Sequence, residues 1–294
     1  MKFKMTDMGD VSLMLGMQIT RDWEKKTLTI SQEYTKSILE RFGMANCKPV
    51  GTLGYSAELS TKQPEEPLLS KEEIQRYQAI TGSAMYLAQI LRYIMYSSGQ
   101  LARAMSRPAK KVYVGAAKHL LRYPAGTTDF TIVYKKGGFK FTAFSDSNWS
   151  NNPDNSKSTS CYIMMLSRAP VSFTSGVQRL TAMSTIVAEL VASALAMKEA
   201  VLCSNMLTEL GFGKEFEQVP LHIDNTATLH EIGNRAFSSR TKHIALRFFY
   251  THELVKENKT TPHYISTERQ LADIGTKHLN KHRLQQLLQM IKSF

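Results

Sequence analysis

The stretch FTAFSDSNWSNNPDNSKSTSCYIMML, from Phe141 to Leu166, ends an apolar run on the carboxylate of Asp146 and then continues into a polar loop. Residues 139–146 alternate with the two-residue period of a β-strand, so Asp146 lies on the strand itself. The Asn, Asp and Pro residues of 147–158 account for a turn, and the simplest role for Asp146 is to start that turn. An acid on a half-buried strand is also typical of a functional site, which makes Asp146 a candidate.

The segments around this stretch predict an α/β fold with a mixed sheet. Strand-like runs separated by turn residues precede a long apolar helix, after which strands and helices alternate. We expect strands at 130–134, 139–146, 159–166, 170–174, 221–224 and 263–267, and helices at 181–210, from 225, at 240–257 and at 271–292. A meander followed by alternating strands and helices indicates a sheet covered by helices.

The first part of the chain has a different pattern. Residues 11–31 predict a β-hairpin, and a linker rich in proline and glycine at 46–70 interrupts several segments with helical spacing. The expected helices are 32–42, 71–105 with breaks near Gly82 and Gly99, and 109–123, which ends before Pro124. We therefore divide the chain into a mostly helical region with one small hairpin, 1–125, and an α/β region, 126–294.

Composition restricts the partners and the compartment. The 294 residues carry a formal net charge of +12, which favours a polyanionic partner such as nucleic acid, although a basic protein without such a partner has the same composition. The three scattered cysteines predict reduced thiols, and no apolar run approaches the length of a membrane span. We expect an intracellular protein.

Four acids in the α/β region occupy the ends of predicted strands or the early turns of predicted helices. They are Asp146, Glu189, Asp224 and Asp273. Each has an ordinary alternative explanation as a helix cap or turn residue, except that Glu189 lies within the apolar run TIVAELVASALA, where an acid usually has a partner. In a compact α/β layer the four can meet at one edge of the sheet.

Carboxylates that meet repel each other unless cations neutralise them, and hard divalent cations prefer oxygen ligands. Two Mg²⁺ ions held about 3.5–4 Å apart activate water and stabilise the leaving oxygen in phosphodiester cleavage. The four acids therefore predict a site for two Mg²⁺ ions, which Mn²⁺ can replace, in a basic protein suited to binding a nucleic-acid backbone.

Motifs along almost the whole chain support this hypothesis. They include LMLGMQIT, YTKSILERFGMANCKPV, ARAMSRP, FSDSNWSNNPDNSKSTSCY, MSTIVAEL, HIDNTAT and QLADIGTKHL. In this order they resemble the C-terminal part of a copia-type retrotransposon polyprotein, where the reverse transcriptase passes into its ribonuclease H domain. The resemblance implies an RNase H-like fold with a five-stranded mixed sheet flanked by helices, preceded by a region like the reverse transcriptase thumb and connection.

The resemblance also implies roles for individual residues. Asp146 matches the first catalytic acid, in the pattern Ser-Asp-x-x-Trp, and the other three acids match the remaining metal-binding carboxylates of the family. The implied reaction is metal-dependent hydrolysis of the RNA strand in an RNA–DNA hybrid, with the hybrid and an upstream palm and fingers as partners. The implied location is the cytoplasm or a retrotransposon particle, with the nucleus as an alternative.

Departures from the family pattern favour a second hypothesis. No Asp-Asp pair occurs in the chain, so polymerase activity is not expected from it alone. Val187, Leu190, Cys161 and Ala245 replace a glutamate, an aromatic residue, a glycine and an acid of the usual pattern. The alternative to an active nuclease is a catalytically degenerate remnant that still binds nucleic acid.

The basic segment SRTKHIALR predicts contacts to phosphate next to the metal site, although a solvated helix face is the alternative. Trp149 is placed to touch a sugar or base, or else to pack over the edge of the sheet. The candidates for binding nucleic acid are Arg240, Lys242, His243, Arg247, Trp149 and Lys277.

Overall fold

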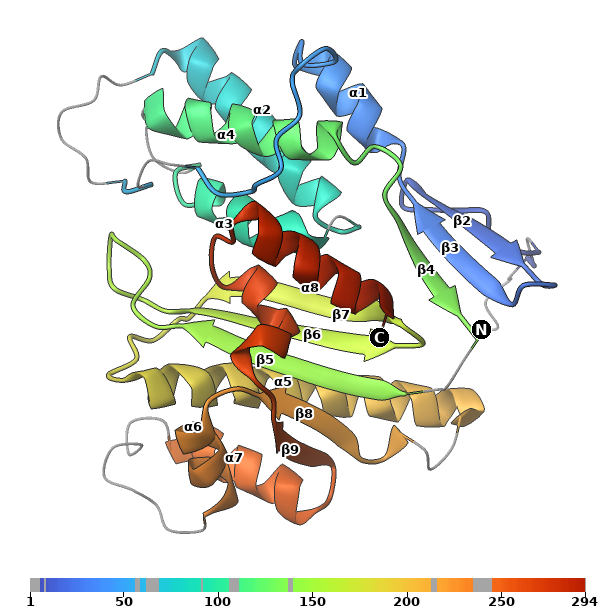
Figure 1. Cartoon of the computed structure of the whole chain (residues 1–294), viewed down its shortest axis with the longest axis vertical. Helices are drawn as coiled ribbons and strands as arrows, with labels where there is room; N and C mark the ends of the chain where they lie inside the picture. Colours follow the sequence, from blue (N-terminus) through green and yellow to red (C-terminus); the bar gives the residue numbers. More distant parts are fainter. Residues whose placement is uncertain are drawn as a thin grey trace, which may run out of the picture.

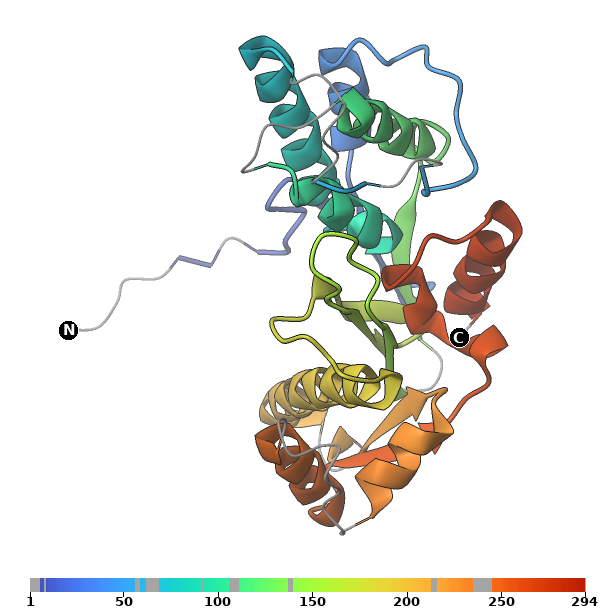
Figure 2. The ribbon, with the colours of Figure 1, turned by 90° about the vertical axis from the view of Figure 1, so that its left-hand side faces the viewer.

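The computed structural model describes residues 6–7, 9–55, 59–61, 69–90, 92–105, 111–136, 140–212, 216–234 and 245–293. A central sheet in the C-terminal half carries helices on both faces, and a helical layer with a smaller sheet lies above it (Figure 1). A view turned by 90° shows the same layers edge-on (Figure 2). None of the described helices is long and apolar enough to cross a membrane.

The central sheet has the strand order β7-β6-β5-β8-β9. Its first three strands form an antiparallel meander, and the other two run parallel to β5. The bounds are β5 Phe141–Asn148, β6 Thr159–Leu166, β7 Ala169–Val177, β8 Val219–Ile223 and β9 Thr260–Tyr264. This topology is that of the RNase H-like fold and confirms the predicted fold class.

Alternation along β5 sends its side chains to two different cores. Phe141 and Ala143 pack with residues of α5 (Thr185–Leu207), whereas Phe144 packs on the opposite face with residues of α8 (Lys281–Ser293). Helix α5 is long and rich in Ala, Val and Leu, so it covers the sheet with a nearly continuous apolar surface. The Ser184 side chain caps it by accepting a hydrogen bond from the Val187 backbone N–H.

Two shorter helices complete this face. Helix α6 is Thr226–Gly233 and α7 is Ala245–Lys256, and α7 packs against α5. The predicted strand 263–267 is β9 and begins three residues earlier, at Thr260, because it pairs in parallel with β8 over its whole length.

The predicted last helix, 271–292, is wrong as a single element. A 3₁₀ helix, η6 Leu271–Gly275, covers the sheet first, and α8 begins only at Lys281. The break has a packing cause: Leu271 and Ile274 are buried, and Gly275 lies so close to Cys161 that a Cβ would collide with the thiol. Asp273 therefore lies in a 3₁₀ helix on the sheet instead of opening an α-helix.

The N-terminal hairpin is confirmed, and it extends into a second sheet of order β1-β2-β3-β4. Strand β4, Thr131–Lys135, pairs antiparallel with β3 and not with the central sheet, whereas the sequence predicts it as part of the α/β region 126–294. The bounds of the others are β1 Leu13–Met14, β2 Met17–Asp22 and β3 Thr27–Ser31. The Tyr134 hydroxyl donates to the Pro170 carbonyl at 2.8 Å, which links the two sheets.

The N-terminal helices are α1 Tyr34–Arg41, α2 Lys71–Leu87, α3 Met95–Ala102 and α4 Lys111–Ala125. The predicted breaks at Gly82 and Gly99 are wrong, since both glycines lie inside helices; α2 ends at Leu87 and α3 begins at Met95. A capping box at Ser70 and buried apolar side chains stabilise α2 by more than the roughly 1 kcal/mol that a helical glycine costs. Pro124 lies in the last turn of α4.

One apolar core joins the two parts of the molecule. Buried side chains of the N-terminal helices, such as Tyr77 and Leu120, belong to the same cluster as Ile163 and Met165 of β6 and Leu284 of α8. The helical layer is therefore packed onto the face of the sheet that carries Phe144, and it is not a separate lobe.

Candidate metal centre

Asp146 lies near the end of β5, on the same face of the strand as Phe144. Its side chain is buried, and its Oδ2 accepts a hydrogen bond from the Thr276 hydroxyl. The residue does not start the loop after the strand, since β5 continues to Asn148. The structure therefore excludes a simple turn role for this acid.

Glu189 comes to the same place from the opposite side of the sheet. It lies in the second turn of α5 and is 6% exposed. Its Oε1 accepts from the Ser147 backbone N–H at 3.2 Å, while Oε2 is buried and has no hydrogen-bond partner among the described residues. A buried carboxylate oxygen without a partner is costly, and a bound cation would satisfy it.

Asp224 follows β8 directly. Because β8 runs parallel to β5, both strands end at the same edge of the sheet, and this brings Asp224 beside Asp146. The Thr267 hydroxyl donates to Asp224 Oδ2 at 2.9 Å. Asp224 does not cap α6. The cap is Asn225, whose side chain accepts a hydrogen bond from the Thr228 backbone N–H at 2.9 Å.

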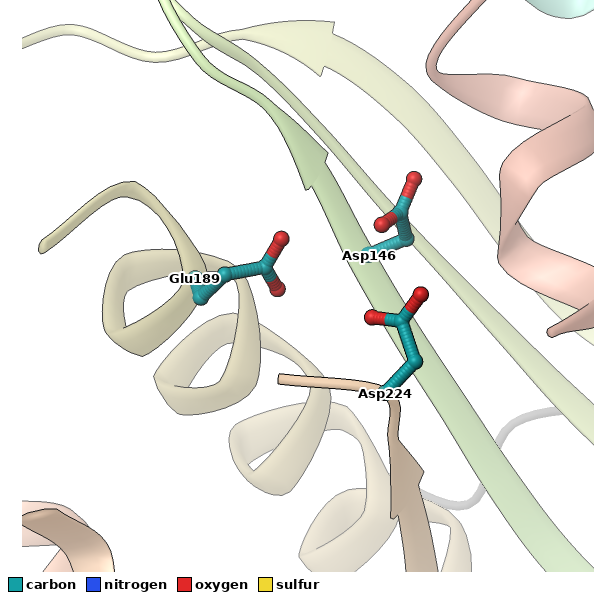
Figure 3. A group of neighbouring side chains, drawn as sticks. All are labelled: Asp146, Glu189 and Asp224. Carbon is teal, nitrogen blue, oxygen red and sulfur yellow. The ribbon is translucent and has the colours of Figure 1, made fainter. Parts of the chain in front are cut away.

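The three carboxylates point toward one another (Figure 3). One ligand oxygen from each of Asp146, Glu189 and Asp224 lies within 4.8 Å of the other two. An all-oxygen set of this kind fits a hard divalent cation better than it fits a transition metal that prefers nitrogen or sulfur. The residues present therefore fit the kind of metal that the sequence predicted.

Burial and mutual repulsion make this cluster unfavourable when it is charged and empty. Burial raises the pKa of Asp146 to about 7, and although Lys277 and the Thr276 hydroxyl oppose this shift, Asp273 and Asp224 add to it. Burial also raises the pKa of Glu189 well above its usual range, with the negative charges of Asp146 and Asp224 adding to the effect. A cation between the three would remove the repulsion.

Asp273 is buried next to this cluster but is engaged differently. Its Oδ1 lies 2.6 Å from Lys277 Nζ, and its Oδ2 lies 3.0 Å from an Arg283 guanidinium nitrogen. Lys277 Nζ is also 3.9 Å from Asp146 Oδ2. Asp273 is outside the group of three ligand oxygens, so its role as a metal ligand stays a prediction.

Comparison with known proteins identifies long relatives. No protein-family model matches the chain. The retrovirus-related Pol polyprotein from transposon TNT 1-94 of Nicotiana tabacum is 30% identical over 288 residues, and that from transposon RE2 of Arabidopsis thaliana is 32% identical over 287. The chain is a homologue of these transposon Pol polyproteins. The matches cover 96% and 95% of this Pol homologue but only 22% and 19% of the two relatives, so the chain spans about a fifth of their length.

Solved structures with some likeness to the Pol homologue include LC11-RNase H1, isolated from compost by a metagenomic approach, with 14% identity and a TM-score of 0.38. That likeness covers 47% of the Pol homologue and 94% of the RNase H1 chain. The foamy viral protease-reverse transcriptase in complex with an RNA/DNA hybrid has 12% identity and a TM-score of 0.40, and covers 87% of the homologue and 29% of its own chain. The fold assignment rests on the strand order given above.

The departures from the family pattern lie mostly in the core of the Pol homologue. Val187, Leu190 and Cys161 are all buried. Cys161 pairs with Asp146 across β5 and β6 and packs against Gly275. These residues belong to the apolar cores on the two faces of the sheet, and none of the three is in the group of ligand oxygens.

The candidates for contact with nucleic acid are only partly described. Arg240, Lys242 and His243 lie outside the described residues. Arg247 is exposed on α7 and lines a groove of about 770 Å³ between α5, α7 and the end of β7. Trp149 is 45% exposed, but its indole N–H donates to the Ala182 carbonyl at 2.9 Å, so the ring is held at the edge of the sheet.

Sequence reasoning missed three polar residues around the centre. Thr276 binds Asp146, Arg283 binds Asp273, and the fully buried Gln270 donates to the Ser145 carbonyl at 3.0 Å, which attaches η6 to β5. Gln270 and Thr276 belong to the motif QLADIGTKHL, so that motif held a usable signal for both. Arg283 lies ten residues beyond Asp273, and no periodic pattern connects the two.

Proposed function

We propose that this chain is the ribonuclease H part of a retrotransposon reverse transcriptase and hydrolyses the RNA strand of RNA–DNA hybrids. The convergence of Asp146, Glu189 and Asp224 within 4.8 Å carries the proposal. The RNase H-like topology and the homology to transposon Pol polyproteins support an enzyme of this kind. We propose Mg²⁺ as the metal, with Mn²⁺ as a substitute.

Three neighbouring groups orient the carboxylates for this reaction. The Ser147 backbone N–H holds Glu189, the Thr276 hydroxyl holds Asp146, and the Thr267 hydroxyl holds Asp224. When bound, the metal supplies an activated water and a positive charge for the leaving oxygen of the phosphodiester. Burial of Asp146 and Glu189 limits competing water, so that each carboxylate keeps the geometry its partner sets.

The groove lined by Arg247 is proposed to carry part of the hybrid backbone. Arg179 and Lys198 line the same groove, which therefore presents three cations, from the segment after β7, from α5 and from α7. Such a track binds phosphates without reading sequence, as recognition of an A-form-like hybrid requires. Arg240, Lys242 and His243 precede α7 in the sequence, and we propose that they extend this track. Lys277 is proposed to contact phosphate as well, next to the carboxylates.

The N-terminal region is proposed to correspond to the thumb and connection of the reverse transcriptase. It supports the loop between β5 and β6: Arg103 donates to the Asn152 side chain at 2.9 Å, and Ser60 and Thr61 donate to Asp154. Because β4 completes the N-terminal sheet, we place the boundary of this region after Lys135. The upstream palm and fingers are the proposed protein partner, and DNA synthesis is not expected of the chain alone.

The test is cleavage of an RNA–DNA hybrid labelled on the RNA strand, with Mg²⁺ or Mn²⁺. We expect cleavage by the unmodified chain and none by Asp224→Asn, while Glu253→Gln on α7 serves as a charge-matched control that stays active. A chain that binds the hybrid and leaves it uncut with either metal would reveal the degenerate remnant instead.

A further inference from the structure

Lys277 and Arg283 enclose the fourth acid of the centre in different ways. Arg283 is fixed by the backbone, since its guanidinium donates to the carbonyls of Thr267 and Glu268 as well as to Asp273. Among the described residues, Lys277 has only carboxylate partners: Asp273 at 2.6 Å and Asp146 at 3.9 Å. Its side chain is 37% exposed, whereas that of Arg283 is 18% exposed. Lys277 is therefore the less constrained of the two cations.

The formal charges show what this lysine does to the metal centre. When all four carboxylates are ionised, as metal binding requires, they carry four negative charges; Lys277 and Arg283 return two positive ones, which leaves two negative charges. One divalent ion between Asp146, Glu189 and Asp224 neutralises that remainder. A second ion would leave an excess of positive charge in a buried site, which is unfavourable unless phosphates enter or Lys277 moves away.

We infer that Lys277 is a positioning residue that holds Asp273 out of the metal centre and takes the place of a second divalent ion until nucleic acid binds. This inference rests on the proposed function, because it concerns the same site. An incoming phosphate offers the ammonium group another anionic partner, and Asp273 then becomes available to a metal.

The geometry favours this role over that of a purely structural salt bridge. A structural bridge needs only Arg283, which already pairs with Asp273 and is anchored at both ends of its guanidinium. Lys277 adds a second cation on the side of Asp273 that faces Asp146.

The experiment is a Mn²⁺ titration of the full chain without nucleic acid. Binding is measured by calorimetry and by electron paramagnetic resonance. We expect one tightly bound Mn²⁺ in the unmodified chain. Lys277→Met removes the charge and keeps the length, so a second Mn²⁺ should bind about tenfold or more tightly than before. Lys281→Met, four residues away and exposed, is the matched control and should bind one ion like the unmodified chain.

Two acid variants complete the test. Asp224→Asn should abolish the single Mn²⁺ site, whereas Asp273→Asn should leave its affinity within about twofold. Two tight Mn²⁺ ions in the unmodified chain, an Asp273→Asn loss equal to that of Asp224→Asn, or a Lys277→Met titration identical to that of the unmodified chain would each overturn the inference. Lys277→Gln replaces Lys277→Met if circular dichroism shows that the latter is unfolded.

The test of the role of Lys277 can fail or succeed independently of the test of the proposed nuclease function. Metal binding in this pattern without cleavage of the hybrid would refute the nuclease and keep the role of Lys277. Cleavage with two ions bound in the absence of nucleic acid would keep the nuclease and refute the role of Lys277.

Discussion

Two aspartates eight residues apart, Asp146 and Asp154, have opposite surroundings. Asp146 lies with other buried acids, and burial raises its pKa to about 7. Asp154, in the middle of the following loop, accepts from the Ser60 hydroxyl at 2.7 Å and from the Thr61 N–H and hydroxyl at 2.8 Å. Although burial opposes it, these hydrogen bonds lower the pKa of Asp154.

The difference shows that the residue type does not determine the role. At Asp154 the protein supplies every donor that the carboxylate needs, so the charge stabilises the contact between the loop and the N-terminal region. At Asp146 the protein supplies too few, and the remaining demand suits a ligand from outside. The surroundings of Asp154 therefore favour stability, and those of Asp146 favour binding of a ligand.

The largest expected difference between Asp146 and Asp154 is in nuclease activity. Asp146→Asn should lower hybrid cleavage by about 10³-fold or more, because it removes a metal-binding charge, while Asp154→Asn should leave cleavage within about twofold. Both rates are measured with saturating Mg²⁺ on chains whose circular dichroism is unchanged. Equal losses from the two changes would contradict the separate roles.

The second effect is on stability: the change at Asp146 that abolishes cleavage should make the metal-free chain more stable. Without metal, the folded-state pKa of Asp146, about 7, lies above its ordinary value of 3.8, so ionisation opposes folding as the pH rises through this window. Asp146→Asn should therefore stabilise the metal-free chain by about 2–4 kcal/mol above pH 7. Below pH 4 both states are protonated and the gain should vanish.

Urea unfolding at pH 4 and pH 8, with chelator present, measures this difference. Asp154→Asn is the matched control, because its folded-state pKa is lowered and removal of its charge should destabilise the chain at pH 8. A gain at pH 8 that Mg²⁺ reverses would sharpen the comparison. A loss for Asp146→Asn at pH 8 would mean that its charge supports the fold.

A third effect concerns Asp154 alone. Asp154→Ala leaves the donors of Ser60 and Thr61 without this acceptor and should lower the free energy of unfolding by about 1–3 kcal/mol. The loop between β5 and β6 should also become more susceptible to protease. Asp129→Ala, an acid outside this contact, provides the reference, and equal stability of the two variants would show that the contact is dispensable.

The smallest effect lies between the two aspartates, at Trp149. Trp149→Phe removes the hydrogen bond to the Ala182 carbonyl and should destabilise the chain by about 1 kcal/mol. If the ring only packs at the sheet edge, hybrid binding should change by less than twofold, as measured by fluorescence anisotropy. A larger loss of binding with normal stability would instead support contact between Trp149 and nucleic acid.

Several parts of the fold follow from local pattern. The period of residues 139–146, the apolar run of α5 and the turn residues after β5 were sufficient to predict the meander, the long helix and the α/β class. Glu189 was identified because an acid inside an apolar helix contradicts that pattern. The break at Gly82 was wrong because the capping box and packing of α2 outweigh the propensity of one glycine, and the break at Gly99 was wrong because α3 buries side chains on both sides of it.

The sequence by itself determined that Asp146 lies on a strand and Glu189 within an apolar helix, because a side chain and its place in the periodic pattern are local facts. Only the tertiary structure decided that Asp146, Glu189 and Asp224 converge, while Asp273 is held by Lys277 and Arg283, and Asp154 by residues about 93 positions away. It also decided that β4 joins the N-terminal sheet. Such contacts depend on how strands pair and helices pack over long sequence separations, and no local periodicity encodes them.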